Sequence, residues 1–258
     1  MTTIPPDGAA TTVPTRVAVI GAKGRMGRAV CTAVEAAPDL ELGPLVDVGD
    51  DVEAVAGADV AVVFSTPDVA VDHVLACVRL GVHAVVGTTG WTSERLDRVR
   101  AALDGAAGVG VLVAPNFALG AVLLMRFAAL AAPHYESVEI IELHHPDKVD
   151  APSGTARHTA ELVAAARREA GSRPIPDATT TSLEGARGAD VDGVRVHSVR
   201  LRGLVAHEEV LLGAPGEQLT LRHDSFDRAS FMPGVLLGVR RIADRPGLTV
   251  GLEHLLEI

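Results

Sequence analysis

A stretch near the middle of the chain, ELHHPDKVDAPSGTA, carries side chains that can move protons and hold an anion. His144 can donate or accept a proton near neutral pH. Lys148, four residues later, can donate a proton or pair with a carboxylate. At Ser153, Gly154 and Thr155, hydroxyl groups and the free N–H groups of a starting helix suit a carboxylate. We interpret the stretch as acid–base groups beside an anion site; a solvated loop with an ordinary helix cap is the alternative.

The adjacent histidines, His144 and His145, follow a predicted strand. Strand geometry points neighbouring side chains to opposite sides, unless the turn at Pro146 reorients one of them. Two histidines near acidic residues can indicate a metal site, but the sequence lacks HxxxH or another recognisable ligand spacing. We therefore expect acid–base chemistry and no metal.

A glycine-rich turn, GAKGRMG, follows the apolar run 16–20 and precedes a helical pattern that stops at Pro38. Gly21, Gly24 and Gly27 would let the backbone approach a pyrophosphate, and the next helix would offer its N–H groups and positive dipole end. The motif alone is weak evidence, but its place between a strand and a helix predicts dinucleotide binding. A merely tight strand–helix turn is the alternative.

Asp47 ends the second predicted strand, 20 residues beyond Gly27, where a carboxylate can bind ribose hydroxyl groups. An acid there favours NAD, but Lys23 and Arg25 in the turn can pair with a 2′-phosphate. We therefore predict use of both NADH and NADPH. A solvated aspartate and solvated loop cations are the alternatives.

Two further polar turns, GTTG at 87–90 and APNF at 114–117, follow predicted strands. Ligands of open α/β sheets bind at the carboxyl ends of strands, so these turns are candidates to contact the nicotinamide and its ribose. Ordinary loop chemistry is the alternative.

The elements that must position these groups fall into two patterns. In the first half, apolar strands alternate with amphipathic helices, which predicts a Rossmann-like, doubly wound parallel sheet covered on both faces. The second half predicts an α+β domain with a mixed sheet, in which the strands from about residue 191 look antiparallel. The expected strands are 16–20, 42–47, 60–64, 83–86, 110–113, 137–145, 193–201, 207–214 and 217–223, and the expected helices are 28–37, 67–81, 92–105, 119–132, 155–171 and 231–243.

The domain prediction places a disordered tail at 1–15, rich in Thr, Pro, Gly and Ala. A dinucleotide-binding domain at 16–116 follows, to which 228–258 return. Residues 117–227 form the substrate-binding and oligomerisation domain.

Composition excludes several classes. The 258 residues carry a net charge of −10 with no long basic run, which argues against non-specific nucleic-acid binding. No apolar run is long enough to span a membrane. The N-terminal segment lacks the pattern of a signal peptide. We therefore expect a cytoplasmic protein that acts on a small molecule.

Together, GAKGRMG, GTTG, APNFALGAVLL and ELHHPDKVDAPSGTA resemble the 4-hydroxy-tetrahydrodipicolinate reductases, also called dihydrodipicolinate reductases, of lysine and diaminopimelate biosynthesis. The resemblance runs from about Arg16 to Leu256, in a form similar to actinobacterial members. It implies hydride transfer from NADH or NADPH to a cyclic, unsaturated dicarboxylate, which gives tetrahydrodipicolinate. It also implies a homotetramer built through the sheet of the second domain.

Carried over by motif, the resemblance implies that His144 is the proton donor and acceptor and Lys148 a proton donor. It implies that His145 and the Gly154–Thr155 backbone bind a substrate carboxylate. The residues that it implies for the cofactor are Gly21, Ala22, Lys23, Gly24, Arg25, Met26, Asp47, Gly87, Thr88, Thr89, Ala114, Pro115, Asn116 and Phe117.

One departure from the family pattern lies at Val63-Phe64-Ser65, where members commonly read Asp-Phe-Thr. Ser65 keeps a hydroxyl, but the acid is missing. We expect the same reaction because the acid–base motif is intact. The alternatives are another two-domain NAD(P)-dependent dehydrogenase, of the aspartate or sugar type, and a non-catalytic NAD-sensing protein.

Overall fold

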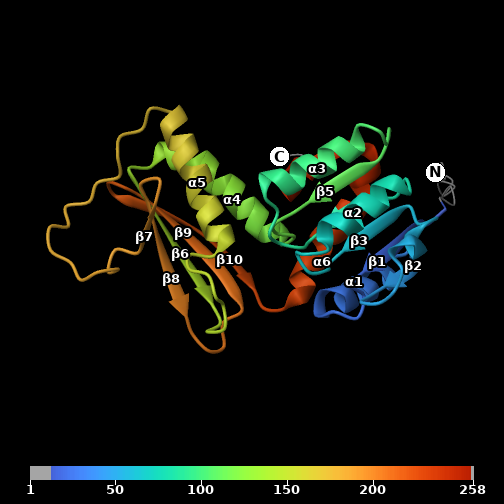
Figure 1. Ribbon diagram of the computed structural model, residues 1–258. Coiled ribbons are helices and arrows are strands. Elements are labelled where there is room, and N and C mark those ends of the chain that lie inside the picture. The colour runs from blue at the N-terminus through green and yellow to red at the C-terminus, as the bar shows by residue number, and fades with distance from the viewer. Residues whose placement is uncertain (1–12, 257–258) are drawn as a thin grey trace, which may run out of the picture. The chain divides into compact units, whose positions relative to one another are not determined.

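The computed structural model describes residues 13–256 (Figure 1). The described chain divides into two compact units, one of residues 13–113 with 235–250 and the other of 114–234 with 251–256. Most of the predicted tail, residues 1–12, lies outside the described residues. Thr15, which the prediction assigned to that tail, already begins the first strand.

The sheet of the first unit is fully parallel, in the order β11-β5-β4-β3-β1-β2. It confirms the predicted Rossmann-like fold. The edge strand β11 was not predicted, because its four residues lie in a short segment between turns. The strands are β1 (Thr15–Ile20), β2 (Leu40–Val46), β3 (Val60–Val63), β4 (His83–Val86), β5 (Gly110–Val113) and β11 (Gly247–Val250).

The strands of this sheet are short and almost wholly apolar because both faces are covered. Ala84 and Val86 pack with residues of the helices after β3 and β4, whereas Val85 lies on the other face, where Gly238 approaches it. Thr92 starts one helix by accepting a hydrogen bond from the Arg95 N–H. The helices are α1 (Arg25–Glu35), α2 (Ala70–Arg79), α3 (Ser93–Leu103) and α6 (Met232–Arg241), with 3-10 turns at Val52–Val55 and Ile242–Asp244.

The second unit contains a mixed sheet in the order β10-β9-β6-β8-β7. It confirms the predicted mixed sheet: β8 runs parallel to β6, whereas the pairs β6–β9, β9–β10 and β7–β8 are antiparallel. The chain leaves β6, passes through a helix and the long loop 170–188, and so returns in the same direction, as a crossover does. The strands are β6 (Ser137–His144), β7 (Ala189–Val191), β8 (Val194–Arg200), β9 (Ala206–Ala214) and β10 (Glu217–Ser225).

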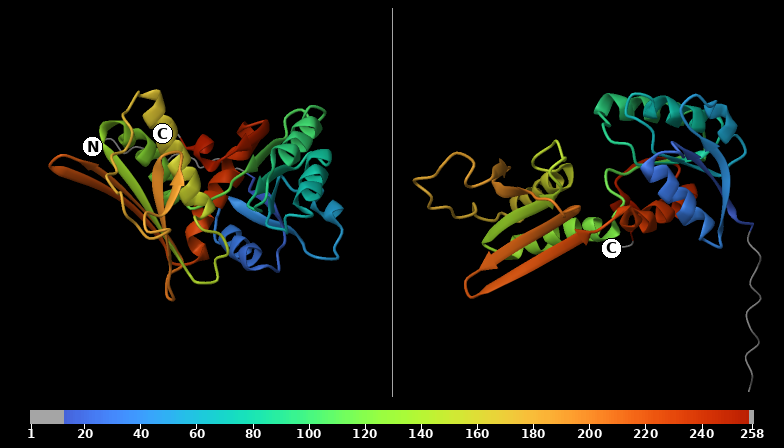
Figure 2. Two further views of the ribbon diagram at one scale, coloured as in Figure 1. Left: turned by 60° about the vertical axis from the view of Figure 1, so that its left-hand side comes forward. Right: turned by 90° about the horizontal axis from the view of Figure 1, so that it is seen from below.

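Two helices, α4 (Leu119–Ala131) and α5 (Gly154–Glu169), pack together on one face of this sheet (Figures 1 and 2). The core of this unit lies between the two helices and the sheet, and the sheet contributes apolar side chains such as Ile140 and Val210 to it. The other face carries half-buried polar side chains, including Glu139 of β6. Further 3-10 turns span Ala132–His134, Arg228–Phe231 and Leu252–Leu255.

The chain end divides differently from the predicted return of 228–258. Val235–Val250 belong to the first unit, because β11 pairs with β5 and Gly238 packs on Val85 and Leu112. Leu252 instead packs near Gly234 in the second unit. The other boundary falls at Ala114, so the APNF turn lies in the second unit and not in the first.

Candidate active site

A pocket of about 190 Å³ lies within the second unit, at the end of the sheet where β6 finishes. The turn before α4, the start of α5 and strands β6, β9 and β10 all contribute to it. Its polar lining includes Asn116, His144, Ser153, Thr155, Glu208 and His223. The pocket therefore gathers residues that are more than 100 positions apart in the sequence.

Strand pairing explains how these side chains meet. Alternation along β6 places Glu142 and His144 on the face that α5 covers. Glu208 of β9 lies directly opposite Glu142, and His223 of β10 lies opposite Glu208. The same face that supplies the apolar core thus ends in a row of polar groups at the pocket.

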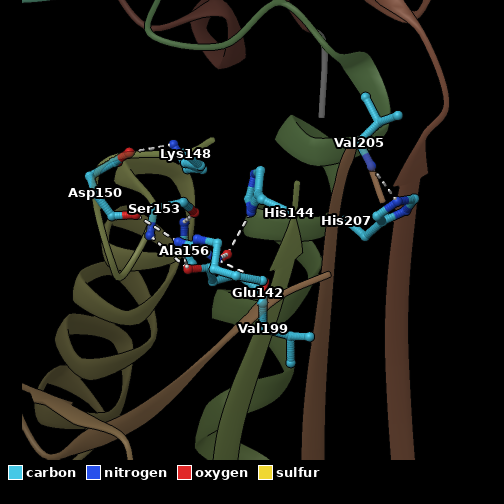
Figure 3. A network of polar contacts seen from close by, with 10 residues as sticks. Glu142, His144, Lys148, Asp150, Ser153, Ala156, Val199, Val205 and His207 are labelled. Carbon is cyan, nitrogen blue, oxygen red and sulfur yellow. Dashed lines mark hydrogen bonds and ion pairs between the residues drawn. The ribbon is translucent and has the colours of Figure 1, made fainter. Parts of the chain in front are cut away.

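The centre of this polar row is an ion-paired histidine. His144 Nδ1 lies 2.5 Å from Glu142 Oε2, and the Glu142 side chain is fully buried (Figure 3). Arg200 of β8 donates to both oxygens of Glu142, each at 2.8 Å. The backbone N–H of Ser153 donates to Glu142 Oε1 at 3.2 Å. One carboxylate therefore connects a strand histidine, a neighbouring strand and the start of α5.

The carboxylate of Glu142 stays ionised through this network. Burial raises its pKa, but the hydrogen bonds from His144, Arg200 and Ser198 outweigh burial and hold the pKa at about 2. At neutral pH Glu142 is therefore an anion beside the imidazole of His144.

The start of α5 has the geometry of an anion site. Ser153 is buried, and its Oγ accepts a hydrogen bond from the Ala156 N–H at 3.2 Å, as an N-cap does. Lys148 Nζ donates to Asp150 Oδ1 at 2.6 Å. The pKa of Asp150 is lowered, chiefly by Lys148 and to a smaller extent by the backbone N–H of Gly154. The predicted carboxylate position at Gly154 thus already interacts with a carboxylate of the chain itself.

The structure brings together only part of the predicted site. His144, Ser153 and Thr155 line the pocket, whereas His145 is exposed and does not line it. Pro115 and Asn116, predicted for the cofactor, line the same pocket, and Asn116 Nδ2 donates to Thr155 Oγ1 at 3.2 Å. Of the four predicted APNF residues, Ala114 and Phe117 are buried.

Sequence reasoning missed several polar residues in or beside this pocket, among them Glu142, Arg200, Glu208 and His223. A signal for Glu142 was present, since it stands two positions before His144 on a strand and so shares its face. The other three lie on β8, β9 and β10, whose places in the sheet no local pattern specifies.

The glycine-rich turn of the first unit fits a pyrophosphate. The N–H groups of Gly21 and Ala22 donate to the Val46 carbonyl, at 2.8 and 3.2 Å, which holds the turn against β2. A Cβ on Gly27 would collide with the backbone of Gly21. Gly24 is the N-cap of α1 and makes no side-chain cap bond. The first N–H groups of α1 therefore have no side-chain cap, which suits an anionic group.

Asp47 also orders this turn. Its Oδ2 accepts a hydrogen bond from the Lys23 N–H at 2.6 Å and its Oδ1 accepts one from the Val48 N–H at 2.8 Å. These two backbone bonds lower the pKa of Asp47. The side chains of Lys23 and Arg25 are exposed.

The GTTG turn packs against the segment 63–65, where the sequence departs from the family pattern. Thr88 Oγ1 donates to the Ser65 carbonyl at 3.0 Å, and the Phe64 ring lies so close to Gly87 that a Cβ would collide with it. Val63, at the position of the family's acid, is fully buried in the apolar core. The apolar core of the first unit therefore accommodates the valine side chain at this position.

Two absences hold for the part of the chain that the structure describes. Within residues 13–256, no cluster of three or more His, Cys, Asp or Glu side chains is arranged to hold a metal ion. No helix in the same range is long and apolar enough to cross a membrane.

Two family models match the chain. "Dihydrodipicolinate reductase, N-terminus" covers residues 15–117, and "Dihydrodipicolinate reductase, C-terminus" covers 120–256. The chain is 63% identical over 245 residues to the 4-hydroxy-tetrahydrodipicolinate reductase of Streptomyces coelicolor, which covers 94% of this chain and 98% of the relative. It is 64% identical over 244 residues to that of Beutenbergia cavernae, with coverage of 94% and 99%.

Solved structures agree with these matches. A dipicolinate-bound dihydrodipicolinate reductase from Paenisporosarcina sp. TG-14 matches with a TM-score of 0.85 at 38% identity, over 95% of this chain and 100% of that one. A probable dehydrogenase from Thermotoga maritima matches with a TM-score of 0.61 at 12% identity, over 93% and 92% of the two chains, and shows the fold alone. The resemblance of the sequence motifs is confirmed: the chain belongs to the dihydrodipicolinate reductase family, whose members are NAD(P)H-dependent oxidoreductases.

Proposed function

We propose that this chain reduces the cyclic dicarboxylate of 4-hydroxy-tetrahydrodipicolinate reductases to tetrahydrodipicolinate, with NADH or NADPH, in lysine and diaminopimelate biosynthesis. The observation that supports this most directly is the pocket of the second unit. There, His144, paired with the buried Glu142, lies beside the start of α5. A proton-transfer group and an anion site in one pocket match the needs of a dicarboxylate that is being reduced.

The bound cofactor supplies the hydride, and the chain supplies charge, orientation and protons. His144 acts as the proton donor and acceptor, and Lys148 as a proton donor. The N–H groups of Gly154 and Thr155, at the positive end of α5, bind a substrate carboxylate, with His145 as an additional partner. The interaction of the Gly154 N–H with the carboxylate of Asp150 supports this assignment.

The first unit binds the cofactor through the remaining predicted residues. The turn Gly21–Met26 and the uncapped start of α1 hold the pyrophosphate, and Asp47 binds ribose hydroxyl groups. The GTTG turn contacts the nicotinamide side. The other cofactor contacts, at the turn 114–117, belong to the second unit, where Pro115 and Asn116 line the pocket.

The direct test couples the purified chain to the synthase that makes the substrate from pyruvate and aspartate semialdehyde, and follows the loss of NADH or NADPH absorbance. We expect turnover that depends on the synthase and none with aspartate or sugars as the sole substrate. Cofactor binding without turnover under these conditions would reject the proposal in favour of a sensing protein.

Cofactor choice gives a second test. Changing both Lys23 and Arg25 to alanine is expected to weaken NADPH binding about tenfold or more, because charge-assisted contacts to a phosphate are lost. NADH binding should change much less, since NADH lacks the 2′-phosphate. Fluorescence titration of both cofactors measures the two Kd values. Equal losses for NADH and NADPH would show that these cations do not recognise the 2′-phosphate.

We also infer a cytoplasmic homotetramer assembled through the sheet of the second unit. One face of this sheet is covered by α4 and α5, and its other face presents half-buried side chains such as those of Glu139 and His197. Cys31 and Cys77 are free thiols, which suits a reducing compartment. Light scattering on the full chain should give four times the monomer mass; a monomer at micromolar concentration would contradict the tetramer.

A further inference from the structure

Glu142 is the most highly connected side chain of the pocket region, although it was not a predicted site residue. Charged or polar groups face it from every element packed around it. His144 lies on its own strand, Ser198 and Arg200 on β8, Glu208 on β9, and the Ser153 N–H at the start of α5. A buried carboxylate with this many donors is fixed in position and keeps its charge.

The contact with His144 determines which nitrogen of the ring faces the pocket. Glu142 is an anion, so Nδ1 of His144, 2.5 Å away, must carry the hydrogen of this bond. Nε2 is then the ring nitrogen left for a molecule in the pocket (Figure 3).

The same carboxylate ties this histidine to the anion site. Glu142 Oε1 accepts the Ser153 N–H at the start of α5. Arg200, bound to both oxygens of Glu142, also donates to the Asp150 carbonyl at 2.6 Å and thereby holds the loop that carries Lys148. Glu142 therefore holds His144 and the start of α5 directly, and it holds the Lys148 loop through Arg200.

We propose that Glu142 is the positioning residue of this site: it fixes the tautomer of His144 and holds the start of α5 and the Lys148 loop in register with that ring. Glu142 acts only through these neighbours and does not line the pocket. The inference rests on the proposed function for its kinetic readouts, but its structural readout is independent of turnover.

The first experiment changes Glu142→Gln, which keeps the shape of the side chain and removes its charge. We expect kcat to fall about tenfold or more, with KM for the dicarboxylate changed less than about threefold. The single tautomer of His144 should be lost as well, because the ring loses the anion that accepts its Nδ1–H. Unchanged kcat, or a fall in kcat without a change of tautomer, would overturn the proposal.

A matched control lies on the same strand. Glu139 of β6 also contacts a histidine and an arginine, His197 at 2.7 Å and Arg187, but on the face away from the pocket. Glu139→Gln removes an equivalent network and should leave kcat and the tautomer of His144 unchanged, with the assembly state checked by light scattering. Equal losses in both variants would assign the effect to general damage of β6 and reject a positioning role.

Removal of the charge of Glu142 leaves Arg200 without its ion partner, which can impair folding. Two further variants keep the test decisive. Glu142→Asp retains a carboxylate, so the wild-type tautomer of His144 should be recovered even where kcat stays reduced. The double variant Glu142→Gln with Arg200→Gln removes both charges together and should still lose this tautomer; a wild-type tautomer in this variant would overturn the proposal.

A readout without substrate separates this inference from the proposed function. The nitrogen shifts of 15N-labelled histidine report which ring nitrogen carries the proton, and His144→Gln assigns the signal. We expect the Nδ1–H form for His144 in the wild type and a mixture of tautomers in Glu142→Gln. If the chain lacks reductase activity but shows this change, the proposed function fails and the inference stands. The Nε2–H form in the wild type would overturn the inference whatever the activity.

Discussion

Replacement of His144 by alanine is expected to lower kcat by about 100-fold or more, the usual contribution of a positioned acid–base group. The Kd of NADH or NADPH should stay close to its wild-type value, because the glycine-rich turn belongs to the other unit of the chain. Synthase-coupled kinetics and fluorescence titration measure the two quantities. The variant leaves the polar network of Glu142, Arg200 and Ser153 in place, so its fold should be retained.

Lys148→Ala tests the second proton donor that we assign to the same motif. Its ammonium group is only partly exposed and is bound to Asp150 in the structure, so the proposal requires it to exchange this partner for the substrate. A loss of similar size in kcat is expected. His197→Ala is the control, since His197 also pairs with a glutamate of β6 but lies on the opposite face. Wild-type kcat in both His144→Ala and Lys148→Ala would refute the assignment of these two residues.

Replacement of Glu208 by glutamine is expected to stabilise the fold at alkaline pH. Glu208 is buried, and its Oε1 has no hydrogen-bond partner. Burial raises its pKa to about 7 from the ordinary 4.5, a bond from Thr159 opposes this, and the charge of Glu142 adds to it. The folded protein therefore holds this proton more tightly than the unfolded chain does.

The sign of the pH dependence follows from that difference. Below pH 4.5 both states are protonated and the group has no effect on stability. Between pH 4.5 and 7 the unfolded chain releases the proton first, so the free energy of unfolding decreases as pH rises. The decrease is complete above pH 7 and amounts to about 3 kcal/mol, since one pKa unit corresponds to about 1.4 kcal/mol.

Urea denaturation at pH 4 and pH 8.5 measures this effect. Glutamine stays neutral, so Glu208→Gln should match the wild type at pH 4 and exceed its stability by about 3 kcal/mol at pH 8.5. Glu209→Gln is the control, because Glu209 lies on the opposite face and pairs with Arg222; it should change stability by less than about 1 kcal/mol at either pH. A Glu208→Gln variant no more stable than the wild type at pH 8.5 would show that Glu208 is not held as a neutral acid.

Features that depend on neighbours in the sequence could be predicted. The turn around Gly21 to Gly27 joins a strand to a helix within a dozen residues, and the predicted helix start after Ser153 is observed at Gly154. Both follow from steric needs of glycine and from capping, which act over a few residues. The family motifs lie in these segments, which is why the sequence alone identified the family.

Features that depend on long-range pairing could not be predicted from the sequence. The bond between Glu142 and Arg200 joins residues 58 positions apart, which meet because β8 pairs with β6. This pairing follows a long connection through α5, the loop 170–188 and β7, whose path no hydrophobic pattern records. The role of Glu142 therefore became visible only with the strand order.

The two glutamate–histidine–arginine clusters of β6 also constrain how the chain can fold. A slip of β6 by one residue against β8 and β9 would exchange its faces. Glu142 would then leave Arg200, and Glu139 would enter an apolar core without a partner. Misfolded pairings of this central strand are thus penalised on both of its faces, so the side chain that positions the active site also disfavours misassembly of the sheet.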